Sequence, residues 1–376
     1  MIDFNFSKEC YSCFLCGNIC PTGAISFNAS FHPIIDKNKC INCNKCDNYC
    51  IKLSEIEYKI KINEENNGYI CKNKSITERK NSSSGGIFIL LAKKILSEQG
   101  YVCGCIYDEN FNPKHILSNK ISDIEKMMGS KYVMSDLNNC MIQIEKKLKE
   151  GIEVLFSGVP CQVAAIKKYL GKYENLKTIS VVCHGSIERN YWIKFLESKK
   201  SKGKILNITM RDKTKGWLNY GLRITYETGE EDITYRKEDG YFLKCFTDGI
   251  FDRDRCLNCK YKGSEIKSDI LLGDAWGGEI LSPKLYDELG VSVVICLTKN
   301  GKEMLEKIKK EIEFERINIE KIIEKNQRII SSPKNNFFRI LFKKSYDKNL
   351  ESVEELCKKF SKDSILKKIL RKINFL

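Results

Sequence analysis

Eight cysteines within the first fifty residues have the type and the spacing that would bind iron and sulfur. They form two runs of the pattern Cys-x2-Cys-x2-Cys-x3-Cys, 30 residues apart: Cys10, Cys13, Cys16 and Cys20, then Cys40, Cys43, Cys46 and Cys50. A [4Fe-4S] cluster needs four thiolate ligands, so eight cysteines suffice for two clusters. In paired runs of this kind, the fourth cysteine of each run binds the cluster of the other run.

The predicted ligand sets are therefore crossed. One set is Cys10, Cys13, Cys16 and Cys50, and the other is Cys40, Cys43, Cys46 and Cys20. The pattern is that of a bacterial-type two-cluster ferredoxin, in which proline follows the fourth cysteine. Pro21 fits this rule, whereas Ile51 replaces the second proline without removing a ligand. Two zinc sites are the alternative, although two identical runs of four cysteines are unusual for zinc.

Length and cysteine usage limit the class of protein. A chain of 376 residues is long for one domain and suits a small cluster-binding module followed by a larger body. Its 19 cysteines occur without an apolar signal stretch behind basic residues, so we expect a reducing, cytoplasmic location. The longest apolar runs are far too short to span a bilayer.

The net charge of +15 is concentrated near the C-terminus, where the last 43 residues carry 12 Lys and Arg against 5 Asp and Glu. Eight apolar positions have helical spacing, which predicts a basic helix docking an apolar stripe on the body: Val353, Leu356, Cys357 and Phe360, then Ile365, Leu366, Ile369 and Leu370. Contact with an acidic partner or a peripheral contact with an anionic membrane surface is the alternative. No motif supports nucleic-acid binding.

Three further segments are expected after the ferredoxin module of residues 1–62. Residues 63–80 are polar and predict a linker that follows a strand at Ile56 to Ile62. Residues 81–330 predict the body, and residues 331–376 a basic helical tail. The predicted fold is thus α+β: a small ferredoxin domain, a larger α/β body with a mixed sheet, and a C-terminal helical tail.

The body begins with a serine- and glycine-rich stretch, Ser82 to Gly86, ahead of an apolar helix from Ile87 to Gln99 and a strand from Tyr101 to Tyr107. Serine caps helices, and glycine lets a ligand approach the backbone closely. Free N–H groups at a helix start can bind a phosphate, so the stretch is a candidate cradle for a dinucleotide. Capping without any ligand is at least as common.

Alternating strands and helices then predict a parallel sheet with crossover helices. A strand from Ile152 to Phe156 leads to Cys161 and a helix that reaches Leu170, and a strand from Ile179 to Val182 ends at Cys183. In open parallel sheets ligands gather at the carboxyl ends of the strands. Two thiols are therefore expected at one sheet edge.

The rest of the body is expected to be mixed. Residues 204–236 alternate in the manner of antiparallel strands. Further buried strands are expected at Asp269 to Leu272 and at Val291 to Leu297, with a last helix from Gly301 to Phe314.

A second group of cysteines lies in this body. Cys256 and Cys259 form a Cys-x2-Cys pair, and together with Cys161 and Cys183 they would supply four ligands to one more [4Fe-4S] cluster. A structural zinc site is an equal alternative on spacing alone, because one such pair does not select its metal.

The order of short motifs in the body resembles the coenzyme F420 hydrogenase/dehydrogenase beta-subunit family. The resemblance runs from about Ser82 to Gly301, and members often carry a fused two-cluster ferredoxin. The motifs are Ser82 to Gly86, Gly129 to Tyr132, Phe156 to Gln162, Cys183 to Gly185, Arg211 to Lys213 with Gly216 and Trp217, Cys256 to Cys259, and Gly273 to Gly277.

This resemblance implies a body that binds FAD and a [4Fe-4S] cluster on Cys161, Cys183, Cys256 and Cys259. It implies flavin contacts at Ser84, Gly85, Gly86, Lys131 and Tyr132. A flavin accepts single electrons and delivers pairs, which suits reduction of an organic bond by one-electron clusters. The implied function is an oxidoreductase that takes electrons from ferredoxin or another low-potential donor to a small organic acceptor, and the direction of flow is open.

Three residues in these motifs are candidate proton donors: His184, Lys213 and Asp274. For His184, next to a candidate ligand, we favour a hydrogen bond to a cluster sulfur or to the backbone over general acid catalysis. The acceptor is open between an F420-like compound and a substrate of a polysaccharide pathway. The rival function is a polyferredoxin-like electron-transfer subunit that lacks flavin and docks on a catalytic partner.

Overall fold

The computed structural model describes residues 9–53, 67–361 and 369. The strand predicted at residues 56–62 lies outside this part of the chain. Two compact units are present: residues 1–131, 135–183 and 259–331 form the first, and residues 132–134, 184–258 and 332–376 form the second. The predicted domain boundaries at residues 62, 80 and 330 stay predictions.

The N-terminal module repeats one small motif, as its cysteine runs suggest. It comprises α1 (Leu15–Ile19), β1 (Ile25–Phe27), β2 (Pro33–Ile35) and α2 (Lys45–Tyr49), with β1 and β2 antiparallel. Both helices have five residues and start after a residue in the left-handed conformation, Phe14 at φ 59° and Asn44 at φ 55°. That conformation costs a bulky residue about 1–2 kcal/mol. Contacts of the Phe14 ring with Phe27 and Phe31 offset the cost.

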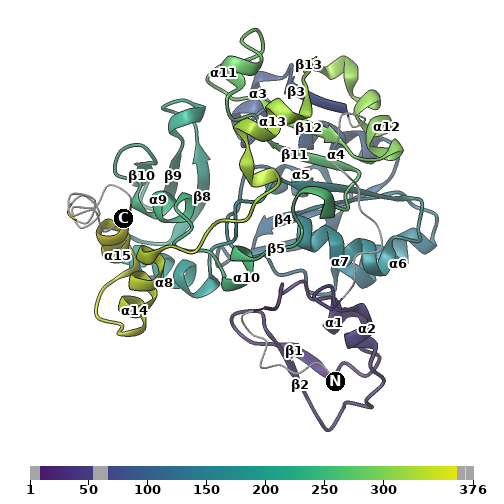
Figure 1. Cartoon of the computed structure of the whole chain (residues 1–376), viewed down its shortest axis with the longest axis horizontal. Coiled ribbons are helices and arrows are strands. Elements are labelled where there is room, and N and C mark those ends of the chain that lie inside the picture. The colour runs from purple at the N-terminus through teal and green to yellow at the C-terminus, as the bar shows by residue number, and fades with distance from the viewer. Residues whose placement is uncertain (1–8, 54–66, 362–368, 370–376) are drawn as a thin grey trace. The chain divides into compact units, whose positions relative to one another are not determined.

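An eight-stranded mixed sheet forms the body of the first unit (Figure 1). Its strand order is β13, β3, β12, β11, β7, β6, β4, β5. The bounds are β3 (Asn67–Asn73), β4 (Tyr101–Tyr107), β5 (Pro113–Ser118), β6 (Val154–Gly158), β7 (Leu176–Val181), β11 (Ile270–Asp274), β12 (Ser292–Cys296) and β13 (Ile312–Arg316).

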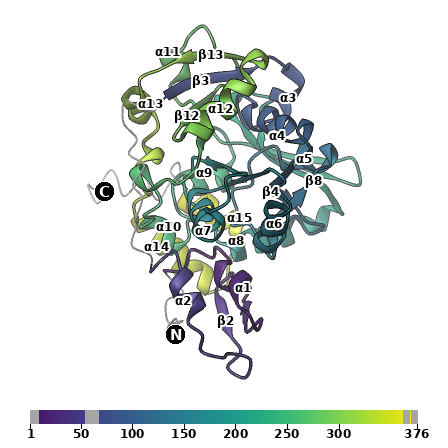
Figure 2. The same ribbon diagram turned by 90° about the vertical axis from the view of Figure 1, so that its right-hand side faces the viewer.

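The four central strands of this sheet are parallel, and each outer strand pairs antiparallel with its neighbours. β4, β6, β7 and β11 pair in parallel, while β12, β3 and β13 extend one side and β5 the other. The helices of this unit are α3 (Ile76–Asn81), α4 (Ile87–Ser97), α5 (Ile121–Met127), α6 (Cys140–Lys149), α7 (Pro160–Leu170), α11 (Gly278–Leu281), α12 (Lys299–Lys307) and α13 (Ile319–Lys325). Helices α4 and α5 pack beside β4 (Figures 1 and 2). The sequence prediction of crossover helices and a mixed sheet is confirmed.

Successive side chains of a strand point to opposite faces of the sheet, so alternate residues of the buried strands pack in two separate hydrophobic cores. Cys71, Ile270 and Val294 pack in one core with α4, α5 and α12. Ile70 and Leu271 pack in the other core with α13. Strands buried on both faces lose the polar alternation that would mark them in a sequence.

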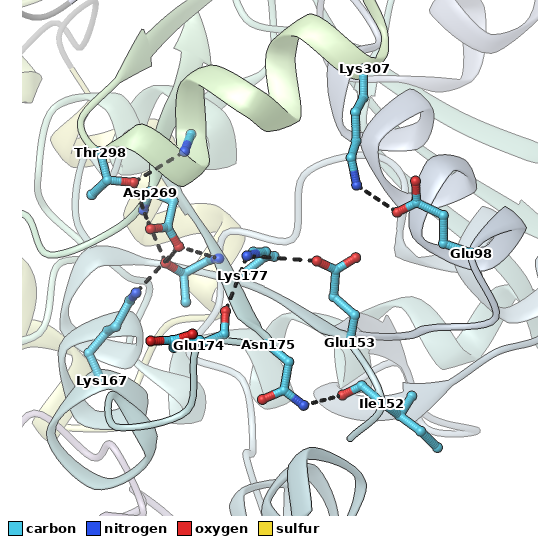
Figure 3. A network of polar contacts seen from close by, with 12 residues as sticks. Glu98, Ile152, Glu153, Lys167, Glu174, Asn175, Lys177, Asp269, Thr298 and Lys307 are labelled. Atoms are coloured by element: carbon cyan, nitrogen blue, oxygen red, sulfur yellow. Dashed lines mark hydrogen bonds and ion pairs between the residues drawn. The ribbon is translucent and has the colours of Figure 1, made fainter. Parts of the chain in front are cut away.

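A buried carboxylate fixes the starts of the central strands. Asp269, 1% exposed, accepts hydrogen bonds at Oδ2 from the Thr178 backbone N at 2.8 Å and from Thr178 Oγ1 at 2.6 Å. Thr298 Oγ1 donates to its Oδ1 at 2.8 Å, and Lys167 Nζ lies 3.3 Å from Oδ2 (Figure 3). One side chain thus joins β7, β11, α7 and the start of α12.

The second unit contains a three-stranded antiparallel sheet in the order β10, β9, β8 and an aromatic core. Trp192, Phe242, Phe251 and Phe342 are buried in it, with ring centroids 4.8 Å apart for Phe242 and Phe251. The elements are α8 (Arg189–Lys199), β8 (Ile205–Asp212), β9 (Gly221–Tyr226), β10 (Glu231–Tyr235), α9 (Tyr241–Thr247), α10 (Asp254–Leu257), α14 (Phe337–Asp347) and α15 (Val353–Phe360). The antiparallel strands predicted within residues 204–236 are confirmed.

Two sequence predictions of local structure are wrong. The described part of the predicted linker at residues 63–80 contains β3 and α3, and β3 pairs with both β12 and β13 inside the sheet. Ile70 and Cys71 are the buried apolar residues of β3. Its lysine and asparagine residues gave the segment a polar composition, so the sequence did not indicate a strand. The helix predicted to reach Phe314 ends at Lys307, and residues 312–316 form the edge strand β13.

The C-terminal helices dock on the second unit as the apolar spacing predicts. Val353, Leu356, Cys357 and Phe360 of α15 are all buried, and α15 contacts α8, α9 and α14. Of the apolar positions predicted beyond Ser361, Ile369 is 51% exposed, and Ile365, Leu366 and Leu370 lie outside the described residues. In the part of the chain that the structure describes, no helix combines the length and the apolar character needed to cross a membrane.

We predict that Asp269→Ala lowers the free energy of unfolding by about 3–5 kcal/mol, because it leaves Lys167 and buried donors without their acceptor. Chemical denaturation followed by circular dichroism measures the change. The control is Lys307→Ala, which removes a half-exposed ion pair with Glu98 and should cost under about 1 kcal/mol. Equal costs for the two variants would contradict the role given to Asp269.

Candidate functional site

The first cysteine site consists of Cys10, Cys13, Cys16 and Cys50. Burial, together with the neighbouring Cys10 and Cys50 thiols, raises the pKa of Cys13 to about 12. Burial also raises the pKa of Cys16 well above its usual value, with Cys13, Cys10 and Cys50 adding to the effect. The four thiols thus lie within electrostatic range of one another, and Cys50 joins the first run although it belongs to the second.

The second cysteine site consists of Cys20, Cys40, Cys43 and Cys46. These thiols line one recess that contains about 410 Å³ of space between its atoms, part of it open to solvent. Pro21, Ala24, Ile25 and Ile35 supply much of its apolar wall. An apolar pocket edged by four sulfurs suits a cluster ligated by thiolates.

A backbone N–H group donates to a cysteine sulfur at each of the two sites. Ser12 N donates to Cys10 Sγ at 3.3 Å, and Ala24 N donates to Cys20 Sγ at 3.3 Å. Burial opposes ionisation of Cys20, but hydrogen bonds from Thr22 and Ala24 lower its pKa overall. Such N–H···S bonds stabilise thiolates, the form that binds metal. Among the described residues no three His, Cys, Asp or Glu side chains gather closely enough to hold a single metal ion.

Two thiols of the body stand at the carboxyl edge of the large sheet. β6 ends at Gly158, and Pro160 in the first turn of α7 leads directly to Cys161. β7 ends at Val181, two residues before Cys183. Lys262 Nζ donates to the Cys183 carbonyl, which brings the segment after Cys259 to this edge.

The hydroxyl of Tyr261 connects these residues. Burial raises its pKa, and Tyr11, Cys13, Cys161 and Cys259 raise it further, so all four lie within electrostatic range. Cys161, Cys183 and Cys259 belong to the first unit, and Cys256 lies in α10 at the end of a second-unit segment.

A buried polar chain supports the Cys161 turn. Gln162 Oε1 accepts from Val159 N at 3.1 Å, and Gln162 Nε2 donates to Ser135 Oγ at 2.8 Å. Ser135 Oγ lies 3.0 Å from His115 Nδ1, and His115 Nε2 lies 3.0 Å from the Ser157 carbonyl. No sequence pattern pointed to His115 or Ser135, because the two are separated from Gln162 along the chain.

The predicted flavin residues fall in two loops that meet. Ser83 Oγ and Ser130 Oγ are 2.7 Å apart, which joins the Ser82 to Gly86 stretch to the Gly129 to Tyr132 stretch. Ser84 Oγ lies 2.9 Å from Ser292 Oγ, and Gly85 N donates to the same oxygen at 3.0 Å. Gly86, at φ 74°, starts α4.

Glycine is required at Gly85 for packing, since a Cβ there would lie 2.5 Å from the Cys71 carbonyl oxygen. Gly129 is different: at φ 76°, its nearest neighbour would be the Asn81 carbonyl oxygen at 4.0 Å, which leaves room beside the backbone. Lys131 Nζ donates to the Met128 carbonyl at 3.0 Å, and burial lowers its pKa. The serine hydroxyls and the Lys131 ammonium group are hydrogen-bond donors that fit a phosphate, and the space beside Gly129 would accommodate it.

Tyr132 and His184 belong to the second unit and share an aromatic neighbour, Phe246. The Phe246 ring stacks on Tyr132 at 4.3 Å between centroids and lies 5.3 Å from the His184 ring. Arg211 Nη1 donates to the Tyr132 hydroxyl at 3.2 Å. His184 and Tyr132, distant in sequence, thus meet at one ring, and Arg211 binds the hydroxyl of Tyr132.

Asp252 is a functional candidate that sequence reasoning missed. Its side chain is fully buried, and its Oδ2 lies 3.9 Å from His184 Nδ1. A Cβ at Gly185 would lie 2.1 Å from Asp252 Oδ1, so glycine after His184 is needed to admit the carboxylate. The glycine of the Cys183 to Gly185 motif was the only sequence signal of such a close approach.

The other two candidate proton donors lie apart in sequence and unit. Lys213 is half-buried in a turn of the second unit, where its carbonyl accepts from Gly216 N. Asp274 ends β11 in the first unit, and its carbonyl accepts from Asn326 Nδ2 at 3.1 Å. Among the cysteines outside the three sets, Cys105 is half-buried and the others are core residues: Cys71, Cys103, Cys140, Cys245, Cys296 and Cys357.

The fold and the cysteine positions define a mixed α/β protein with thiols gathered in a small N-terminal module and at the carboxyl edge of a large sheet. Residues 152–322 match the family model that describes the C-terminal part of the beta subunit of coenzyme F420 hydrogenase/dehydrogenase. This segment, somewhat under half of the chain, is similar to the beta-subunit family, and the match supports the resemblance that the motifs indicate. The motifs at residues 82–86 and 129–132 precede the matched segment.

One solved structure with a similar chain is the xenon-derivatized F420-reducing [NiFe] hydrogenase complex from Methanosarcina barkeri. The identity is 20%, the alignment covers 79% of this chain and 92% of that chain, and the TM-score is 0.47. No curated protein matches the sequence.

The pH dependence of stability should report on His115. Burial lowers its pKa from 6.5 to about 4, so the unfolded chain binds a proton more readily than the folded chain. We predict that this residue contributes a loss of about 3 kcal/mol in unfolding free energy as pH falls from above 6.5 to 4. Denaturation at pH 7, 6 and 5 measures the slope. The matched variant His115→Gln should flatten it, and an unchanged slope would contradict the prediction.

Proposed function

We propose that the protein is an iron–sulfur flavoprotein oxidoreductase that passes electrons from a ferredoxin-type donor through [4Fe-4S] clusters and FAD to a small organic acceptor. The grouping of the N-terminal thiols carries the proposal. Each site contains three cysteines of one run and the fourth of the other, the arrangement of a two-cluster ferredoxin. The module would therefore hold two clusters.

A third cluster is proposed for Cys161, Cys183, Cys256 and Cys259. Support comes from the convergence of Cys161, Cys183 and the segment after Cys259 on one sheet edge. Cys256 follows from the Cys-x2-Cys spacing, which brings it within reach of the same metal as Cys259. The His115, Ser135 and Gln162 chain would hold the Cys161 ligand in position.

The proposed flavin contacts are Ser84, Gly85, Gly86, Lys131 and Tyr132. The Ser83 and Ser130 bond supports them, because it sets the start of α4 beside the Gly129 backbone. When bound, FAD would supply the exchange between one-electron and two-electron chemistry. Lys131 would neutralise a phosphate, and burial would strengthen that attraction because the local dielectric is low.

His184, Lys213 and Asp274 remain the proposed residues for proton handling. Asp252 beside His184 supports an orienting role for the pair, because its buried carboxylate oxygen lies 3.9 Å from His184 Nδ1. The acceptor is proposed only as an F420-like or polysaccharide-pathway compound. A ferredoxin-type donor, a cytoplasmic location and a peripheral contact of the basic tail with an acidic surface complete the proposal.

We predict twelve irons, twelve sulfides and one FAD per chain after anaerobic purification, measured by iron, sulfide, zinc and flavin quantitation of one sample. Eight irons with zinc and no flavin would overturn the reductase. Twelve irons without flavin would instead favour the polyferredoxin-like subunit, which has no reductase activity alone.

Cysteine variants test the crossed ligand sets. Cys20→Ala should lose the cluster of the second site, although Cys20 belongs to the first run, and Cys50→Ala should lose the cluster of the first site. Redox-resolved EPR spectra identify which signal disappears. Cys245→Ala is the matched control, since Cys245 is a core thiol outside the three sets and should keep all iron. Loss of the same signal in both variants would contradict crossing.

For the flavin, we predict that Lys131→Met weakens FAD binding about tenfold, since a charge-assisted contact to phosphate is lost. Fluorescence titration of flavin-depleted protein measures the dissociation constant. Lys126→Met removes an exposed lysine of the nearby α5 and should leave the constant unchanged. Equal effects of the two variants would indicate a general charge effect and not a Lys131 contact.

A further inference from the structure

The N-terminal module contacts the large-sheet body at several places, and a short segment that directly follows Cys259 makes three of the hydrogen bonds. Lys260 N donates to the Tyr11 hydroxyl at 3.2 Å, and Lys260 Nζ donates to the Lys52 carbonyl at 3.1 Å. Tyr261 donates its hydroxyl to the Ile51 carbonyl at 2.7 Å. Two consecutive residues of the body thus bind both ends of the module's cysteine runs.

The aromatic pair at this contact is fully packed. Tyr11 is 4% exposed and Tyr261 is 2% exposed, and their rings meet edge to face with centroids 5.1 Å apart. Ile51, the residue that stands where the ferredoxin pattern has proline, is 2% exposed. Buried aromatic pairs joined by hydrogen bonds are the usual anchors of a stable contact surface.

The two cysteine sites of the module differ in exposure. Tyr261, two residues after Cys259, contacts Tyr11, which is next to Cys10 of the first site. Helix α1, which contains Cys16 of the first site, packs against α7, which contains Cys161. The second site has the exposed Cys43 and, beside it, Ile41 with 64% of its surface exposed. Secondary contacts join α1 and α2 to the body, through Asn18 Nδ2 with the Asn138 carbonyl and through the Tyr49 and Tyr169 rings.

We propose that Tyr261 and Tyr11 are positioning residues that fix the module in one orientation, with the first cysteine site turned to Cys161 and Cys259. Among the described residues, the second cysteine site is then the more exposed of the two, through Cys43. The functional consequence is that electrons from an external donor enter at the second site and leave through the first, and this consequence rests on the proposed function. The docking itself depends only on contacts between residues of this chain.

The first test is amide hydrogen exchange on the anaerobically purified full-length protein. Tyr261→Ala removes the ring and the bond to Ile51, and should raise exchange about tenfold or more at residues 50–53 and 260–262. Tyr261→Phe keeps the ring and should give a smaller rise at the same amides, so it carries the test if the alanine variant does not fold. The matched control is Tyr226→Phe, which removes a tyrosine bond to Asp232 in the second unit and should change neither segment.

The second test probes the orientation of the module relative to the large-sheet body through the magnetic coupling between clusters, measured by EPR of the reduced protein. In Cys20→Ala protein, which lacks the cluster of the second site, magnetic coupling between the remaining clusters should persist, and adding Tyr261→Ala should weaken it. Unchanged exchange in both Tyr261 variants, or coupling lost in Cys20→Ala alone, would overturn the proposal. If the iron and flavin quantitation contradicts the proposed function, the exchange result still decides whether Tyr261 fixes the module. A failure of the proposed function can therefore be distinguished from a failure of this inference.

Discussion

The parallel register of β6, β7 and β11 is the constraint on which the candidate site in the body depends. Asp269 fixes that register from the opposite edge, because it bonds Thr178 in β7 while its own backbone leads into β11. With the strand starts held, the strand ends carry Cys161, Cys183 and Asp274 to one edge. A slip of one residue in register would turn the side chain of Asp274, the last residue of β11, to the other face of the sheet.

The N-terminal module places eight thiols in a segment that is too short for a substantial apolar core. It does so with a repeated backbone motif: the left-handed conformation occurs at Ser12 and Phe14 and again at Asn42 and Asn44. Each pair bends the backbone around its cysteines. Such short modules gain stability from the metal that they bind, because the ligands constrain the fold.

Buried polar groups in the body surround the thiols and do not replace the apolar core. The His115 chain holds the turn before Cys161, and Asp252 lies beside His184, next to Cys183. Both groups are assembled from distant segments. Their low-dielectric surroundings make their hydrogen bonds specific, which is how a site is held to one geometry.

The sequence by itself determined what depends on local spacing. The cysteine runs, the positions of Cys161 and Cys183 after buried strands, the antiparallel stretch of residues 204–236 and the docked stripe of α15 follow from periodicity and ligand spacing, and the structure has these elements in place. Only the tertiary structure decided what depends on contacts between distant segments. It put β3 inside the sheet, since burial from both faces overrides a polar composition, and it brought Tyr261 to Tyr11 and Asp252 to His184. No local pattern encodes those pairs, because each forms only when segments far apart in the chain are packed together.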